Sequence, residues 1–527
     1  MSEFKLTVTH NGIIGKAQIT DGESFLSALR NADYSGINAP CGGNGTCGQC
    51  RIRVTGKVKS PGEGCRSLED EEILACRYTA ASDCEVLIPE ISRMEVVTGG
   101  AGDIKPEGTG LGAAVDIGTT TVAAFLYDMQ TGHQLAVVSG RNAQRAYGAD
   151  VISRIQFSDT EGGLDKLRNA VRRQIDEALN KLCEKSGRQR RDITMISIAG
   201  NTVMEHIFDD LSPVSIGVAP FETLSLFGCE KPGGDYFDGL SRDSVLYLAP
   251  ALAGYVGGDI TAGLLSSDAW QNENTCLFID IGTNGEMGIG DKNGYTCCAT
   301  AAGPAFEGAE IECGMDASEG AINIVRYVGG RVEFETIGGT KAKGICGSGL
   351  IDALSVMLRC GGVEESGRMV PPEDAPENIA AHLKEDERGK MRFYFTEDVY
   401  VSAEDVRQLQ LAKSAIRAGI ETLIEMRNKS TDEIGSVLIA GGFGAFMDVT
   451  SACAIGLLPP AFKNKTVHVG NAAGAGAALT LNSEVRQQLA EFSRKCDYHE
   501  LSSSPMFMEK YIECMIFDEV FDIYPEI

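Results

Sequence analysis

Two short stretches of the chain combine a carboxylate, a glycine and hydroxyl side chains in a pattern that suits phosphate chemistry. Asp116 and Asp280 each end an apolar run and each begin the sequence Asp-Ile-Gly-Thr. Backbone N–H groups that turn outward in such loops bind phosphate oxygens, and the carboxylate can hold Mg²⁺ or orient a water molecule. A single copy would favour an ordinary hairpin with an aspartate in its turn. Two copies favour a pair of facing loops that hold one polyphosphate from both sides.

The residues that follow each copy predict the same local structure twice. The pattern is a strand, a turn and a second strand, at residues 122–127, 130–132 and 134–139, and again at residues 286–289, 292–294 and 295–300. Asn-Gly between apolar runs, as in the second unit, is a strong hairpin signal. Two β-turn-β-turn-β units in one chain indicate an internal duplication.

Three cysteines in the first fifty residues have a spacing typical of metal or cluster ligands. Cys41, Cys47 and Cys50 form a Cys-x5-Cys-x2-Cys pattern in a glycine-rich stretch, where backbone amides can turn toward inorganic sulfide. The candidates for a fourth ligand are Cys65, Cys76 and Cys84. A structural zinc site is the alternative, but zinc sites more often pair two Cys-x2-Cys hooks, and only one is present here. The pattern therefore favours an iron–sulfur cluster.

The segments around these cysteines resemble the β-grasp fold of [2Fe–2S] ferredoxins. They predict a hairpin, a helix and further strands, at residues 4–8, 16–20, 24–32, 51–54 and 84–88. Cys76 lies in Ile-Leu-Ala-Cys-Arg, which resembles the context of the fourth ligand in such ferredoxins, and the x5 spacing resembles the adrenodoxin-type variant. The resemblance implies a ferredoxin-like domain over residues 1–92, with its [2Fe–2S] cluster held by Cys41, Cys47, Cys50 and Cys76.

Three further motifs, together with the paired Asp-Ile-Gly-Thr loops, resemble the actin-like (ASKHA) ATPase superfamily. Residues 437–444 resemble its adenosine motif, and residues 199–202 and 470–476 resemble its two connecting helices, which pack closely at the hinge between the lobes. All five motifs occur in the expected order within residues 111–480. The resemblance implies a duplicated ribonuclease-H-like fold of the α/β class, placed after the α+β ferredoxin-like domain.

The same resemblance implies a role for each loop residue. Asp116 and Asp280 would act on Mg²⁺ and on the attacking water. ATP phosphates would be held by Gly118, Thr119, Thr120, Gly282, Thr283 and Asn284, and adenosine by Gly441, Gly442 and Gly444.

Three other polar residues each leave two interpretations open. Asp259 is either a contact for Mg²⁺ or water, or the N-cap of a helix over residues 261–265. Glu307, in Gly-Pro-Ala-Phe-Glu-Gly, either activates the attacking water or is a solvent-facing turn carboxylate. Ser348, at the start of a predicted helix, either contacts a phosphate or a partner's cofactor, or simply caps the helix.

The composition limits the partners and the compartment. A net charge of −27 over 527 residues repels phosphate backbones, so we do not expect nucleic-acid binding. The sequence begins without an apolar leader, no uncharged apolar run has the length of a membrane span, and 17 cysteines are spread along the chain. We therefore expect a cytoplasmic protein with reduced thiols and no membrane contact.

Changes in composition divide the rest of the chain into four parts. Residues 93–110 are rich in glycine and predict a flexible linker. The duplicated units lie in predicted subdomains at residues 111–270 and 271–495, and residues 496–527 form an extension of no predicted role. Within the second subdomain, residues 362–400 are polar and contain prolines, which predicts a surface insertion.

The two modules, an electron carrier and an ATP-driven hinge, must serve one function. No Gly-x4-Gly-Lys-Ser/Thr sequence is present, which argues against a P-loop ATPase. The combination resembles the reductive activators of corrinoid proteins, to which residues 142–155 and the loops around Glu307 and Ser348 are also similar. That resemblance implies ATP-dependent, one-electron reduction of Co(II) to Co(I) in the corrinoid-binding protein of a methyltransferase system. It also implies an upstream donor of the ferredoxin or flavodoxin type, and homodimers are common in that family.

Two other functions stay open from the sequence. The first is an ATP-dependent activator of a radical dehydratase or an aromatic-ring reductase, although these usually hold a [4Fe–4S] cluster between two subunits. The second is a sensor that binds nucleotide and cluster without turnover. Measuring ATP hydrolysis with and without a corrinoid partner separates the sensor from the enzyme.

Overall fold

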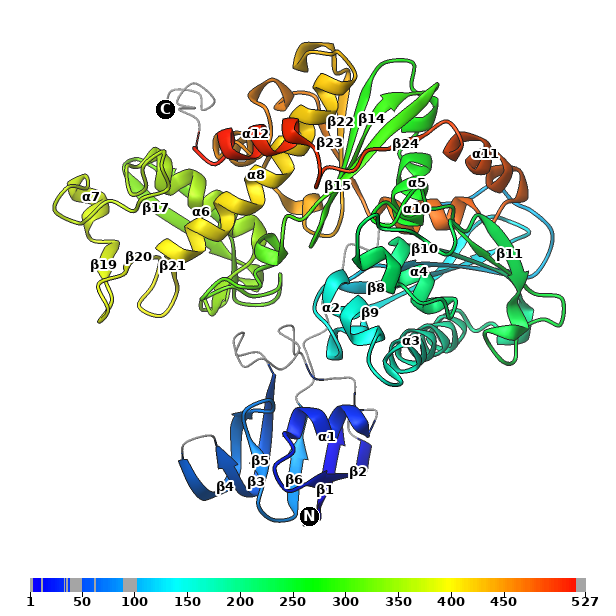
Figure 1. Cartoon of the computed structure of the whole chain (residues 1–527), viewed down its shortest axis with the longest axis horizontal. Helices are drawn as coiled ribbons and strands as arrows, with labels where there is room; N and C mark the ends of the chain where they lie inside the picture. The colour runs from blue at the N-terminus through cyan, green and yellow to red at the C-terminus, as the bar shows by residue number, and fades with distance from the viewer. Residues whose placement is uncertain are drawn as a thin grey trace.

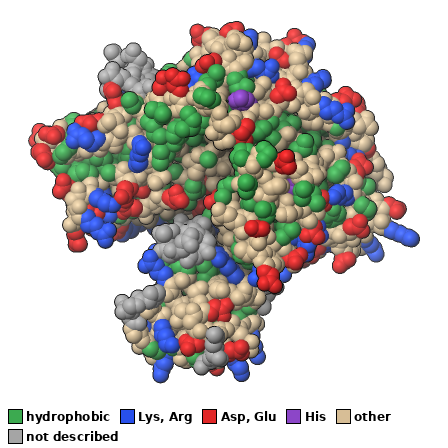
Figure 2. All heavy atoms as spheres, viewed as in Figure 1, with side chains coloured by type: hydrophobic (Ala, Val, Ile, Leu, Met, Phe, Trp, Pro, Cys, Tyr) green, Lys and Arg blue, Asp and Glu red, His purple; other side chains and the backbone are tan. Residues whose placement is uncertain are grey.

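The computed structural model describes residues 3–10, 13–32, 34, 37, 50–60, 63–88 and 102–517. These residues form a small N-terminal domain below two larger lobes that lie side by side (Figure 1). On the face drawn in Figure 2, acidic and basic side chains are interspersed over the lobes and the N-terminal domain. Among the described helices, none combines the length and the apolar composition that crossing a membrane requires.

The N-terminal domain is a mixed sheet with one helix against it. In sheet order its main strands are β2 (Ile13–Thr20), β1 (Glu3–His10), β6 (Cys84–Leu87), β3 (Arg51–Ser60) and β4 (Glu63–Leu74), and β5 (Thr79–Ala80) pairs with β3. β1 and β6 are parallel neighbours. Helix α1 (Phe25–Asn31) is capped by Ser24, whose hydroxyl accepts from the Ser27 backbone, and it buries Phe25 and Leu29 in the core of the domain. This is the ferredoxin-like β-grasp arrangement that the sequence predicts.

The two lobes contain the same sheet twice. In order, the first sheet is β11 (Cys229–Pro232), β12 (Val245–Leu248), β10 (Ile193–Gly200), β7 (Leu111–Ile117), β8 (Thr121–Asp128) and β9 (Gln134–Arg141). The second is β23 (Thr466–Gly470), β22 (Ser436–Ala440), β13 (Cys276–Ile281), β14 (Gly285–Asp291), β15 (Gly294–Thr300) and β24 (Asp497–Tyr498). In each lobe an antiparallel meander is joined by two parallel strands on one side. The predicted duplication and the ASKHA-type fold are thereby confirmed.

Helices cover these sheets, which explains why β7 and β13 are almost wholly apolar. α3 (Gly163–Ser186) packs on the first sheet with α4 (Thr202–Phe208) and ends at Gly187, which has a positive φ of 66°. α8 (Ala403–Met426) packs on the second sheet and begins with a capping box formed by Ser402 and Asp405. The other helices are α2 (Val151–Ser158), α6 (Gly347–Arg359), α7 (Glu377–Ala380), α9 (Val449–Ala454), α11 (Ser483–Ser493) and α12 (Pro505–Glu513).

Two helices, α5 (Gly258–Ser266) and α10 (Ala472–Leu479), cross closely between the lobes. A Cβ added to Gly476 would lie 2.1 Å from the Ala262 carbonyl oxygen, so the backbones touch at this point. The sequence predicts instead that the segment at residues 199–202 provides the partner of α10. That prediction is wrong, because α10 follows β23 and the equivalent strand of the first sheet is β12, which leads to α5 and not to α4.

The second lobe carries additional elements beyond its sheet. One small sheet contains β16 (Ala321–Val328), β17 (Arg331–Thr336) and β18 (Gly344–Ile345), and another contains β19 (Leu383–Glu385), β20 (Met391–Tyr394) and β21 (Tyr400–Ser402). The latter lies in the predicted polar insertion, yet it buries Phe393 completely in the core of the lobe. The described part of the C-terminal extension pairs β24 with β15 and packs α12 beside α8 (Figure 1).

Candidate functional site

The two predicted aspartates occupy the same position in the two sheets. Asp116 pairs in register with Ala199 of the parallel strand beside it, and Asp280 pairs in the same way with Ala440. Both side chains are half-buried. The charge of Asp280 raises the pKa of Asp116, so the two carboxylates, one from each lobe, lie near enough to interact.

A group of acidic side chains surrounds this point. Loss of water and, after it, the charge of the Asp259 carboxylate raise the pKa of Asp116 to about 8 and that of Asp280 to about 7. Burial also raises the pKa of Asp259, to about 6, and the pKa of Glu286 is raised by burial and then by Asp259 and Asp280. Oxygen ligands of this kind are the ones that Mg²⁺ prefers, and a divalent cation would relieve their mutual repulsion. The donor chemistry therefore suits Mg²⁺, although among the described residues no three acidic, histidine or cysteine side chains already converge on one metal position.

Asp259 belongs to this acidic group and does not cap a helix. The N-cap of α5 is Gly257, which offers no side chain. The Asp259 carboxylate accepts from the backbone N–H of Ile260 at 2.9 Å, within the first turn of α5. Of the two interpretations left open by the sequence, the structure contradicts the N-cap.

Two buried side chains that the sequence did not single out fix the loop after Asp116. Asn142 Nδ2 donates to the carbonyl oxygen of Gly118 at 2.8 Å, and Arg154 Nη2 donates to that of Thr119 at 2.5 Å. Arg154 is fully buried and its Nε donates to the Gly148 carbonyl at 3.1 Å. Both residues lie in the stretch 142–155, whose similarity to the corrinoid activators is visible in the sequence although their contacts are not.

The equivalent loop after Asp280 contains a buried hydroxyl without a partner among the described residues. Thr283 is 7 % exposed, and its Oγ1 makes no hydrogen bond there. The Gly282 N–H donates to the Asn284 carbonyl at 3.0 Å, and Asn284 Nδ2 donates to Glu286 at 3.2 Å. Because buried hydroxyls normally have a partner, a phosphate oxygen at this position would complete the loop.

Glu307 joins the two lobes at the phosphate loops. It ends the short helix η6 (Pro304–Glu307) of the second lobe, and its Oε2 accepts from Thr120 Oγ1 of the first lobe at 2.9 Å. Its charge also contributes to the raised pKa of Asp280. A half-buried carboxylate with these neighbours is not a solvent-facing turn residue, so the geometry favours the interpretation in which Glu307 is part of the site.

The loop after β22 lies directly against Asp280. Gly441 has a φ of +92°, and a Cβ there would lie 2.6 Å from the Asp280 carboxylate, so this position requires glycine. The next residues bring the ring of Phe443 onto that of Phe306, with 5.4 Å between centroids in a stacked geometry. The predicted adenosine loop therefore packs on the segment that ends in Glu307.

The remaining predicted binding residues are Gly442 and Gly444 of this loop, and Ser348 of α6. A Cβ added to Gly442 would meet no atom within 4 Å, so the space beside it is open, and Gly444 begins the short helix η9 (Gly444–Phe446). Ser348 is 8 % exposed and donates to the Asn323 carbonyl at 3.1 Å. The N-cap of α6 is Cys346, so the capping interpretation of Ser348 is wrong.

The cysteine site is described in part. Cys41 and Cys47 lie outside the described residues. The sulfur atoms of Cys50, just before β3, and of Cys76, just after β4, are 3.2 Å apart. Of the other two candidates, Cys65 is exposed and Cys84 is buried at the start of β6. A pair of neighbouring thiols, one of them half-buried, fits two ligands of a [2Fe–2S] cluster.

Comparison with known proteins assigns each part of the chain. Residues 8–81 match the 2Fe–2S iron–sulfur cluster binding domain, residues 111–272 match the RACo middle region, and residues 274–527 match the C-terminal domain of RACo, the ASKHA domain. Over 425 residues the chain is 34 % identical to the corrinoid activation enzyme RamQ of Eubacterium limosum, covering 77 % of this chain and 70 % of the relative. The chain belongs to the RACo family.

Two further proteins are similar to this RACo family member. The [Co(II) methylated amine-specific corrinoid protein] reductase of Methanosarcina barkeri is 23 % identical over 435 residues, with 76 % of each chain covered. A solved structure of a reductive activator for corrinoid, iron–sulfur protein has a TM-score of 0.69 and 30 % identity, with 98 % of each chain covered. The matches identify a [2Fe–2S] cluster and ATP as the cofactors. Asp116 lies within the matched middle region, and Asp280 lies within the matched ASKHA domain.

Proposed function

We propose that this protein uses ATP to drive the one-electron reduction of Co(II) to Co(I) in a corrinoid-binding protein. The observation that carries the proposal is a cluster-binding domain joined, in one chain, to two lobes whose phosphate loops face each other. The activities for which the relatives are named, corrinoid activation and Co(II) corrinoid protein reduction, support the same substrate class. The corrinoid belongs to the partner protein, and a ferredoxin or flavodoxin is the proposed upstream donor.

We assign the nucleotide contacts by loop. Asp116 and Asp280 would hold Mg²⁺ and orient the attacking water, and Glu307 would accept a proton from that water. Phosphate oxygens would meet the loop residues Gly118, Thr119, Thr120, Gly282, Thr283 and Asn284, and adenosine would lie along Gly441, Gly442 and Gly444. Ser348 has its hydroxyl bonded to a carbonyl, and we give it a supporting role in this loop region.

Electron transfer and ATP hydrolysis are two separate reactions, and each is balanced by itself. A [2Fe–2S] cluster held by Cys41, Cys47, Cys50 and Cys76 would supply one electron at a time. The donor is oxidised by one electron and the cobalt is reduced by one, while ATP and water give ADP and phosphate. A potential deficit of about 100 mV corresponds to about 2.3 kcal/mol per electron. A change in lobe closure during hydrolysis is able to offset a cost of that size.

The test is anaerobic mixing of the reduced protein with a Co(II) corrinoid protein, followed by visible spectroscopy. We expect Co(I) to appear with MgATP and to appear far more slowly without nucleotide. Cys76→Ser should remove the cluster absorption and the reaction, whereas Cys65→Ser, at an exposed thiol of the same domain, should retain both. Equal rates of Co(I) formation with and without ATP would show that the coupling is absent.

We also propose a cytoplasmic location. Several cysteines of the described part of the chain, among them Cys276 and Cys297, are completely buried in the lobe cores and form no disulfide. Reduced thiols on this scale suit a reducing compartment.

A further inference from the structure

Two contacts run in parallel between the lobes beside the nucleotide loops. Thr120 of the first lobe donates to Glu307 of the second at 2.9 Å. Arg141, the last residue of β9, forms an ion pair with Asp316 of the second lobe. The four residues form a two-point connection between the lobes.

Within the first lobe, the two anchor points are adjacent. Arg141 is paired in register with Thr121 across β8 and β9. The N–H of Asn142 donates to the Thr120 carbonyl at 2.9 Å, which fixes the end of β9 to the phosphate loop. A displacement of Arg141 is therefore also a displacement of the phosphate loop.

Within the second lobe, the two anchor points are adjacent as well. A Cβ added to Gly308 would lie 2.8 Å from the Met315 carbonyl oxygen and 2.9 Å from its nitrogen. Gly308 directly follows Glu307, and Met315 directly precedes Asp316. The backbone beside Asp316 thus rests on the backbone beside Glu307, and neither can shift without the other.

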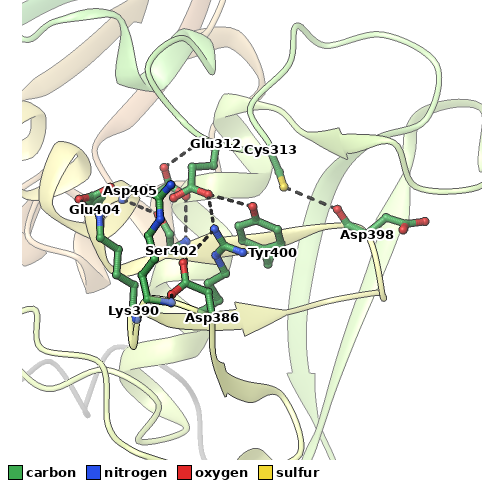
Figure 3. Close-up of polar contacts among 11 residues, drawn as sticks. Glu312, Cys313, Asp386, Lys390, Asp398, Tyr400, Ser402, Glu404 and Asp405 are labelled. Atoms are coloured by element: carbon green, nitrogen blue, oxygen red, sulfur yellow. Dashed lines mark hydrogen bonds and ion pairs between the residues drawn. The ribbon is translucent and has the colours of Figure 1, made fainter. Parts of the chain in front are cut away.

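The loop between these points is also fixed from the far side (Figure 3). Glu312 accepts from Arg392 at 3.0 Å and from Tyr400 at 2.8 Å, and its own N–H donates to Asp405 at 2.9 Å. These partners belong to β20, β21 and the first turn of α8. The loop 308–316 is therefore held in place at several points, so a displacement of Asp316 would also displace Glu307.

The ion pair is well enough buried for its loss to matter. The side chains of Arg141 and Asp316 are 19 % and 26 % exposed. Removing one member of a mostly buried pair leaves the other charge without compensation, in contrast to a pair at the surface. Lys341 and Asp398 form a surface pair in the same lobe, with side chains 79 % and 69 % exposed, and provide a matched comparison.

We propose that Arg141 and Asp316 are positioning residues for ATP hydrolysis, which hold Glu307 against the phosphate loop of the first lobe when the lobes are closed. The proposal rests on the proposed function, in which Glu307 acts on the attacking water. Neither residue of the pair needs to touch the nucleotide. Their ion pair instead sets the distance between Glu307 and Thr120 of the phosphate loop.

The test compares Asp316→Asn with Asp398→Asn in the full-length protein, using steady-state ATP hydrolysis and titration with a fluorescent ADP analogue. We expect Asp316→Asn to lower kcat by about tenfold or more, because misplacing a catalytic group by a small distance has effects of this size. ADP affinity should change by less than about threefold, since the nucleotide contacts themselves stay in place. Asp398→Asn, which makes the same chemical change, should leave both quantities unaltered.

A charge reversal separates positioning from a general loss of stability. The double variant Arg141→Asp/Asp316→Arg should recover most of the kcat lost in either single variant, because it restores the ion pair. A kcat of Asp316→Asn within about twofold of the unmodified protein, or a folded double variant as slow as the singles, would overturn the proposal. Glu307→Gln distinguishes the two proposals. If Glu307→Gln retains full activity, the proposed role of Glu307 is wrong. If Glu307→Gln is inactive and Asp316→Asn retains its activity, only the positioning role of the ion pair is wrong.

Discussion

The two lobes share one sheet topology and use equivalent positions for different purposes. Gly200 is the last residue of β10 and Gly441 directly follows β22, and these two strands pair with β7 and β13. A Cβ on Gly441 would lie 2.6 Å from the Asp280 carboxylate, whereas a Cβ on Gly200 would lie 3.1 Å from the Ile117 carbonyl. Only Gly441 has a positive φ. The duplicated backbone thus supplies two similar loops, of which only the one in the second lobe uses a left-handed glycine to lie against the neighbouring aspartate.

The next residue of each loop makes the same distinction. In the first lobe it is Asn201, which caps α4 and donates to Glu286 of the other lobe at 3.5 Å. In the second lobe it is Gly442, which has open space beside it. The first loop thus contacts the other lobe, whereas the second leaves open space at the place where we propose that adenosine binds. Duplication therefore gives the two lobes equivalent loops, and single residues within these loops determine which contacts each loop makes.

The largest expected difference between the lobes concerns the two aspartates. We expect Asp280→Asn to lower kcat for ATP hydrolysis by about 10²- to 10⁴-fold, because Asp280 is the aspartate whose pKa responds to Glu307. Asp116→Asn should chiefly raise the Mg²⁺ concentration needed for half-maximal activity, since removing one carboxylate weakens a site of oxygen ligands. Hydrolysis rates at graded Mg²⁺ concentrations measure both quantities. Equal effects of the two variants on both would show that the lobes are not specialised.

The matched glycines give the next largest effect. Gly441→Ala should weaken binding of a fluorescent ADP analogue by about tenfold, because the left-handed backbone costs an alanine about 1–2 kcal/mol and its Cβ would press on Asp280. Gly200→Ala meets its nearest neighbour at 3.1 Å with an ordinary φ, so its effect should be smaller. Similar losses of affinity in the two variants would contradict an adenosine role for one loop alone.

Much of this arrangement follows from the sequence because its signals are local. The repeated Asp-Ile-Gly-Thr stretches, each followed by turn residues at matching offsets, predict both meanders and the positions of Asp116 and Asp280. The cysteine spacing and the Ile-Leu-Ala-Cys context predict a ferredoxin-like domain, and Cys50 and Cys76 do lie together. Signals of this kind need only neighbouring residues.

What the sequence did not reveal depends on contacts between distant segments. The pairing of α10 with α5 follows from which strands lie on one side of each sheet, and no local pattern encodes that order. Arg154 reaches the carbonyl of Thr119, and Arg141 reaches Asp316 in the other lobe, over separations that periodicity cannot detect. The capping interpretation of Ser348 failed for a smaller reason, since the helix begins two residues earlier than that interpretation requires.

The crossing helices offer a comparison in which the lobes should behave alike. A Cβ on Gly263 of α5 would lie 2.6 Å from the ring of Phe278, and a Cβ on Gly474 of α10 would lie 2.7 Å from the ring of Phe125. Gly263→Ala and Gly474→Ala should each lower the free energy of unfolding by about 1–3 kcal/mol, because both sites are overpacked by the added methyl group. Calorimetry measures the loss, with Gly140→Ala as control, whose nearest neighbour is at 3.8 Å. A large loss at one helix alone would break the symmetry of the crossing.

The smallest expected effect is a pH dependence confined to the first lobe. His206 is fully buried in α4, with Nδ1 bonded to the Thr202 carbonyl and Nε2 accepting from the N–H groups of Leu224 and Ser225. Burial lowers the pKa of His206 below 6.5. A proton on Nε2 would turn this acceptor into a donor that faces the two backbone N–H groups, and both hydrogen bonds would be lost. The unfolded chain therefore binds a proton near pH 6.5 that the folded chain does not, so this contribution to stability is present above that pH and is lost as the pH falls.

The free energy of unfolding should therefore be lower at pH 5 than at pH 7.5. Chemical denaturation at the two pH values measures it, and His206→Gln, which is neutral at both, should show a smaller difference. Hydrogen exchange locates it, because protection at pH 5 should fall first in residues 202–225 while β13 and α8 stay protected. Equal loss of protection in the two lobes would mean that acid destabilises the protein through groups that both lobes contain. His206 would then not be the cause of the acid sensitivity of the first lobe.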